Sequence, residues 1–296
     1  GVPISTARSH ISYSNMVWVL SDLVVTRPEG GAELMHVAND RTKDYYWKIH
    51  ASIDPKALRS LLETNAQRGL DLFEFTTPPQ VDGEVWGRFH DYDRTGFRGR
   101  VALSNITFRG ESVSDFQTAV EMTNKFIKFL EPKLSRGDEK LSATGIGLDL
   151  DTKRIFFTNG FSTADPMAVA RAIGKKTAQN FAPHQFLRPP TVHAHGMIEI
   201  RPAGRPDLGD MEFDVDGGPY RWNKFTPTRV TGKIFWRDKT LVLTNMQFDF
   251  YDGKLEGNAA FDLSPEFGTD FQFELRAMGV DLHSLMTDIS SPTNKL

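Results

Sequence analysis

Two histidines separated by a single residue, His193 and His195, are the residues of this chain most suited to metal chemistry. In an extended strand both imidazoles lie on one face, as the ligands of a zinc site can. The sequence places no third ligand near them, and a similar stretch 111 residues earlier carries Asp82 and Glu84 instead. The pattern therefore indicates a polar strand face, and we predict no metal site here.

Carboxylates stand close together at two other places, Asp91 with Asp93 and Asp149 with Asp151. They lie among turn residues and lack the ligand spacing of a calcium loop. The sequence has no phosphate-binding glycine loop, no nucleophile elbow and no His-Glu-x-x-His motif. It also has no cysteine, which excludes thiolate metal sites and a cysteine nucleophile. We therefore predict a protein that is not an enzyme and uses no cofactor.

Composition limits the partners of the chain. Its 296 residues carry a formal net charge of −3, and no basic stripe of the kind that binds nucleic acid is present. No apolar run approaches the roughly 18 residues of a membrane-spanning helix. We interpret the chain as a piece of a longer protein, so any membrane attachment would come from segments outside it. Hydrophobic residues make up 39% of the chain, including 22 Phe, so a folded protein is expected.

Most of the chain alternates apolar and polar residues with a period of two. Examples are residues 45–53, 81–89, 246–250 and 271–277. This alternation predicts antiparallel strands with one apolar and one solvated face. The fold class expected is therefore mainly β with short α-helices.

Internal repetition suggests how these strands are organised. The helix-start pattern Asp54-Pro55 recurs as Asp165-Pro166, 111 residues later, and an Asp281-Leu282 start follows near the C-terminal end. Aspartate at the N-cap and proline at the first helical position favour a helix at each Asp-Pro pair. We predict tandem repeats of about 110 residues that form a curled, groove-like antiparallel sheet, with one helix per repeat. The expected ranges are 1–109 with a helix near 54–68, 110–217 with a helix near 165–181, and a partial repeat over 218–296.

The apolar strand face is the main candidate for a functional surface. One short helix per repeat cannot cover a sheet of many strands, so either two sheets cover each other or the sheet curls around an apolar channel. The residues expected to share one continuous concave face, where a hydrophobic ligand would bind, are Val85, Phe89, Ile198, Phe248, Phe250, Phe261, Phe271 and Phe273.

Residues 230–286 resemble the C-terminal region of AsmA-like bacterial envelope proteins. The resemblance rests on the strand–turn–strand pattern from Val230 to Met246, on the Tyr251-Asp252-Gly253-Lys254-Leu255 turn, and on Gly279-Val280-Asp281-Leu282. It implies a periplasmic or cell-envelope location in a double-membrane bacterium, with an inner-membrane anchor in the full-length protein. It also implies a long β-groove that carries phospholipid between membranes as part of outer-membrane biogenesis.

Three functions follow from these patterns. The first is lipid binding and transfer, with phospholipid or another hydrophobic ligand on the apolar face. The second is a structural β-repeat without a ligand. The third is a carbohydrate-binding β module that uses Trp86, Trp222 and Trp236.

Overall fold

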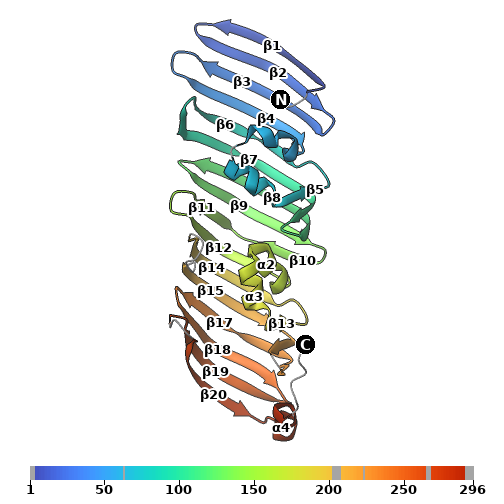
Figure 1. Ribbon diagram of the computed structural model, residues 1–296, viewed down its shortest axis with the longest axis vertical. Coiled ribbons are helices and arrows are strands. Elements are labelled where there is room, and N and C mark those ends of the chain that lie inside the picture. Colours follow the sequence, from blue (N-terminus) through green and yellow to red (C-terminus); the bar gives the residue numbers. More distant parts are fainter. Residues whose placement is uncertain (1–3, 63, 202–207, 223, 265–267, 291–296) are drawn as a thin grey trace. The chain divides into compact units, whose positions relative to one another are not determined.

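The computed structural model describes residues 4–62, 64–201, 208–222, 224–264 and 268–290. The chain is mainly β, with antiparallel strands and few helices, as the alternation predicts. It forms two compact units (Figure 1). The N-terminal unit comprises Gly1–Asp138 and Ser142–Thr152, and the C-terminal unit comprises Glu139–Leu141 and Lys153–Leu296.

The N-terminal unit is an antiparallel sheet in which most strands pair with their neighbours in sequence. The ladder runs β1–β2–β3–β4–β6–β7–β8–β9–β11, and the short β5 pairs with the end of β7. The strands are β1 (Thr6–Ser14), β2 (Val17–Arg27), β3 (Gly30–Asn39), β4 (Asp44–Ile53), β5 (Phe73–Phe75), β6 (Gln80–Arg88), β7 (Asp91–Phe108), β8 (Glu111–Thr123), β9 (Phe126–Arg136) and β11 (Gly145–Asp149).

The C-terminal unit has the same antiparallel organisation. Its ladder runs β12–β14–β15–β17–β18–β19–β20, and β13 pairs separately with β16. The strands are β12 (Arg154–Ser162), β13 (His184–Phe186), β14 (Thr191–Glu199), β15 (Leu208–Gly217), β16 (Tyr220–Trp222), β17 (Arg229–Arg237), β18 (Thr240–Phe250), β19 (Gly253–Asp262) and β20 (Asp270–Met278). The four-residue β10 (Glu139–Ser142) is divided between the two units.

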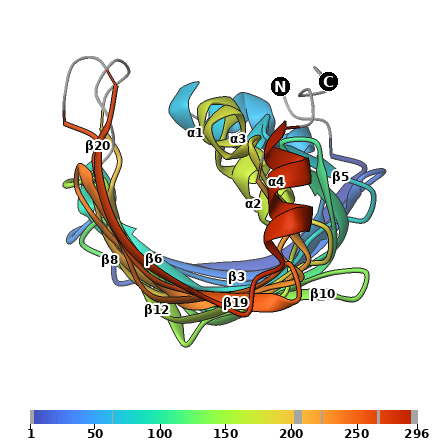
Figure 2. The ribbon, with the colours of Figure 1, turned by 90° about the horizontal axis from the view of Figure 1, so that it is seen from below.

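Helices begin where the Asp-Pro pairs predict them. The Asp54 side chain accepts from the Lys56 amide at the start of η1 (Pro55–Leu61), and the Asp165 side chain accepts from the Met167 amide at the start of α2 (Pro166–Ile173). In each unit the sheet is curved and these helices lie on its concave side (Figure 2).

The prediction of one helix near 54–68 and one near 165–181 is wrong in detail, because each stretch forms two short helices. The first is a 3-10 helix that ends at Leu62, whose backbone is extended, and α1 (Thr64–Leu70) follows. In the second stretch Gly174 leaves the helical conformation and separates α2 from α3 (Lys175–Phe181). A 3-10 segment rarely exceeds one or two turns, which explains why η1 does not continue.

Candidate functional site

Strand register gathers apolar side chains into a row across the N-terminal sheet. Residues directly opposite each other in an antiparallel ladder point to the same face. Trp47 lies opposite Val85, and Val85 lies opposite Phe97. The whole row consists of Ile11, Leu20, His36, Trp47, Val85, Phe97, Met122, Ile127 and Leu148. One polar ring enters this row, since His36 is buried and stacks on Trp47 with centroids 3.8 Å apart.

Phe89 lies just beyond the end of β6. Its ring centroid is 4.9 Å from that of Tyr45, which stands two residues before Trp47 and therefore on the same face. The Phe89 side chain is 47% exposed. Val85 and Phe89 thus belong to the apolar face of the N-terminal unit.

The other six predicted residues lie on one face of the C-terminal sheet. Two complete rows cross it, and they contain three of the six residues. The first row is Met211, Trp236, Leu241, Phe261 and Phe271, and the second is Ala194, Phe213, Ile234, Leu243, Ala259 and Phe273. Ile198 lies opposite Ile155 on β12, Phe248 opposite Leu255, and Phe250 opposite Gly253.

Large side chains on these faces remain open to solvent. Phe271 is 63% exposed and Phe273 is 58% exposed, and their rings stack with centroids 6.0 Å apart. No Phe, Trp or Tyr side chain that the structure describes is fully buried. The buried members of the C-terminal face are smaller or flexible, namely Met211, Val230 and Met246. A second sheet does not cover this face within the described part of the unit, in contrast to a sandwich core.

Helix α4 (Leu282–Ser290) lies near one end of the C-terminal apolar face. The Tyr251 hydroxyl donates to a carboxylate oxygen of Asp288 on α4, and the Tyr251 ring contacts Phe250 at 4.4 Å between centroids. Burial, followed by this hydrogen bond, raises the pKa of Tyr251 to about 12. The phenol therefore stays protonated at neutral pH, and the contact anchors α4 beside Phe250.

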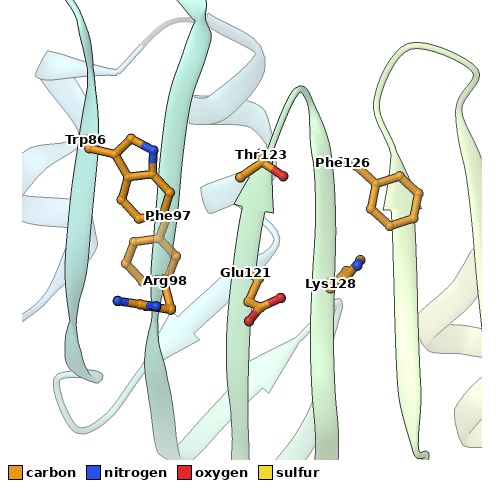
Figure 3. Close-up of a pocket in the computed structure, with 7 residues that line it drawn as sticks. All are labelled: Trp86, Phe97, Arg98, Glu121, Thr123, Phe126 and Lys128. Carbon is orange, nitrogen blue, oxygen red and sulfur yellow. The ribbon is translucent and has the colours of Figure 1, made fainter. Parts of the chain in front are cut away.

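The opposite face of the N-terminal sheet is polar and carries a shallow hollow (Figure 3). Residues from β6 to β9 line it: Trp86, Phe97, Arg98, Glu121, Thr123, Phe126 and Lys128. Arg98 Nη2 donates to Glu84 Oε2 at 2.9 Å, and this bond is the main reason that the Glu84 pKa lies below its ordinary value. The carboxylate of Glu84 is thus held in its charged, paired form.

His193 and His195 lie on the polar face of the C-terminal sheet. His193 stands opposite Asp214 and its ring contacts Phe161, while His195 Nε2 lies 3.5 Å from Glu212 Oε2. Lys233 Nζ lies 3.1 Å from Asp214 and 3.3 Å from Glu212, and these two carboxylates raise the lysine pKa. Among the described residues, no group of three His, Asp or Glu side chains is arranged to hold a metal ion.

The acidic pairs also form ion pairs and turns. Asp91 pairs with Arg94 at 3.2 Å, and Asp93 pairs with Lys125 at 2.8 Å. Asp149 Oδ1 accepts from the backbone amide of Asp151, which is a turn contact. These carboxylates therefore serve local structure, as their turn context indicates.

The three tryptophans proposed for carbohydrate binding do not share one surface. Trp86 lines the polar hollow of the N-terminal unit, whereas Trp236 belongs to an apolar row of the C-terminal unit. Trp222 is exposed on the small β13–β16 sheet.

Several members of the apolar rows were not among the predicted residues. They include Trp47, Phe97, Phe157, Phe213, Trp236 and Leu275. Alternation alone could have marked most of them. Their neighbours across the sheet depend on register, which the sequence pattern does not specify.

Comparison with models of known protein families, with curated proteins and with solved structures gives no match for this chain. The described helices include none that is long and apolar enough to cross a membrane.

Proposed function

We propose that this chain is a non-enzymatic lipid-binding and lipid-transfer segment that holds acyl chains on its apolar sheet faces. The observation that carries the proposal is the exposed aromatic surface of β18–β20, where Phe271 and Phe273 are more than half exposed. An ordinary soluble protein rarely leaves contiguous apolar surface open. A buried methylene contributes about 0.8 kcal/mol, so a long acyl chain laid on such a face gains affinity without any polar recognition.

We further propose that the chain consists of tandem repeats over 1–109, 110–217 and 218–296. Elements at a constant spacing support this. The run η1, α1, β5 and β6 starts at residues 55, 64, 73 and 80, and the run α2, α3, β13 and β14 starts 111 residues later at 166, 175, 184 and 191. Likewise β2 spans Val17–Arg27 and β9 spans Phe126–Arg136, at a spacing of 109.

Irregularities in the strands recur with the same spacing. Asp22, Glu131 and Asn245 all have left-handed backbone, with φ of 49°, 46° and 52°, inside β2, β9 and β18. The β1–β2 ladder shifts register between Arg8 and His10, and the β8–β9 ladder shifts between Gln117 and Ala119. Such bulges bend and twist a strand. Repeated bulges therefore support a sheet that curls into a groove with the apolar face inside.

The envelope location and the phospholipid ligand rest on the resemblance of residues 230–286 to AsmA-like proteins. A structural β-repeat without ligand is the main alternative. It requires the apolar face to be covered by protein, and the exposure of Phe271 and Phe273 favours a ligand over this reading.

Lipid extraction and melting of the Phe250→Asp variant test the proposal. The purified parent protein should carry extractable phospholipid, detected by mass spectrometry. Phe250 is half-buried on the apolar face, so water can reach an Asp there; the fold should survive while lipid is lost. In a closed core the same carboxylate would be buried unpaired, which costs several kcal/mol and would collapse the melting transition.

Gln247 supplies the matched control, because it lies on β18 opposite Thr231, on the other face. Gln247→Asp should leave both melting and bound lipid unchanged. A parent protein without lipid and a Phe250→Asp variant that unfolds would together contradict the transfer proposal and favour the structural one.

A further inference from the structure

The outer edge of β20 is open in the part of the chain that the structure describes. β20 pairs with β19 on one side only, and all nine of its side chains are exposed. An unpaired strand edge presents a row of backbone donors and acceptors to any strand that can lie against it.

The corresponding edge is occupied in both earlier repeats. β4 is followed by the helix capped by Asp54 and is then paired by β6, and β12 is followed by the helix capped by Asp165 and is then paired by β14. β20 is followed by α4, where Asp281 accepts from the His283 amide at 2.9 Å. β20 and α4 thus repeat the strand and capped helix, with the paired strand missing from the described residues.

A charged pair marks one end of that edge in both repeats. Asp44 on β4 lies opposite Arg88 on β6, with 2.9 Å between Arg88 Nε and Asp44 Oδ1. Arg154 on β12 lies opposite Glu199 on β14, at 3.0 Å. The partner strand therefore supplies the opposite charge in each case, although the sign is reversed between the two.

Asp270 holds this place on β20, at its first residue. Its neighbour across the β19–β20 ladder is Asp262, so two carboxylates face each other. Like charges directly opposite in a ladder are destabilising. A cation on a strand at the open edge would reach Asp270 as Arg88 reaches Asp44.

We propose that the open edge of β20 docks an antiparallel β-strand of a partner polypeptide. That strand carries Lys or Arg opposite Asp270. Opposite Phe271 and Phe273 it carries small or aliphatic residues. The places equivalent to Phe271 and Phe273 are Tyr45 and Trp47 on β4, which lie opposite Gly87 and Val85. The inference rests on the repeat proposed above and is independent of lipid binding.

The sequence of β6 supplies a probe. A peptide of residues 79–89 with Glu84→Lys, to match Glu274, would set Arg88 opposite Asp270 and Trp86 opposite Gln272. Because the chain has no cysteine, a Gln272→Cys variant has a single thiol. A peptide with Trp86→Cys should form a disulfide with that variant, and a peptide with Gln80→Cys should not, because residue 80 would lie at the far end of the strand.

A charge swap tests the pairing without depending on one variant's folding. Asp270→Lys should weaken binding of the fluorescent peptide by about fivefold, and an Arg88→Glu change in the peptide should restore it. Absence of peptide binding to the parent protein, or cross-linking to both cysteine positions alike, would overturn the proposal. So would a concentration-dependent dimer of the parent that excludes the peptide, since the edge would then bind a second copy. Lipid content measured on the same samples reports separately on the transfer proposal.

Discussion

Phe261 and Phe271 are cross-strand partners in the β19–β20 ladder, with ring centroids 6.4 Å apart. Phe271 and its stacked neighbour Phe273 face solvent. We expect Phe271→Asp and Phe273→Asp to change the free energy of unfolding by only about 0.5 kcal/mol, because the new carboxylates remain hydrated. Bound lipid should fall in both variants, as measured by extraction and mass spectrometry.

Gln272 lies between these two residues and points to the opposite face of β20. Gln272→Asp is therefore the matched control, with unchanged lipid expected. Equal lipid loss in all three variants would indicate a general effect of charge on β20 and would remove the apolar face from the explanation.

Met211 offers a second prediction, because it is only 3% exposed within its apolar row. Met211→Ala should cost about 2–5 kcal/mol of unfolding free energy, since it removes buried methylenes and leaves a cavity. Met278→Ala, at a site that is 36% exposed, should cost much less. Urea unfolding of the C-terminal unit measures both, and similar losses would show that Met211 is not a core residue.

The Asp165 cap gives a third prediction. Its carboxylate accepts from the Met167 amide at 3.0 Å. Asp165→Ala should destabilise α2 by about 1 kcal/mol, and Asp165→Asn, which keeps an acceptor oxygen, should lose less. Hydrogen exchange at the Met167 amide reports the change, and equal exchange in the two variants would argue against the cap.

Histidine titrations form a fourth prediction. Burial lowers the pKa of His184, whose Nδ1 lies 2.6 Å from the Tyr220 hydroxyl oxygen, whereas the Asp82 carboxylate raises the pKa of His50. His184 should therefore titrate below about 6.5 and His50 above it, in one NMR series. The reverse order would contradict both environments.

The two shifts have opposite consequences for stability. For His184 the unfolded chain binds a proton more readily, so stability falls as the pH drops below the ordinary histidine value. For His50 the folded chain holds the proton more tightly. Its contribution is therefore present at low pH and is lost as the pH rises through the raised pKa.

Local sequence signals were sufficient for much of the fold. Asp54 and Asp165 marked the helix starts because capping depends on residues one or two positions away. The alternation of residues 45–53 and 271–277 marked β4 and β20, since the pleat period is fixed by the backbone. The split at Leu62 and Gly174 was missed, because the helices are too short for periodicity to show a break.

The candidate site depended on information that single strands do not contain. Alternation placed Phe248 and Phe250 on one face of β18. It did not reveal that Asn245 adopts a left-handed conformation, which keeps Leu243 and Met246 on that same face despite their odd spacing. Register and bulges follow from pairing between strands, and so they became visible only in the structure.

The pairing pattern also bears on how the chain reaches its fold. From β1 to β4, and again from β17 to β20, each strand pairs with the one just before it. Partners close in sequence have little loop entropy to overcome, and a low contact order goes with rapid folding. Each hairpin can therefore form as it leaves the ribosome, and the growing sheet serves as the template for the strand that is synthesised next.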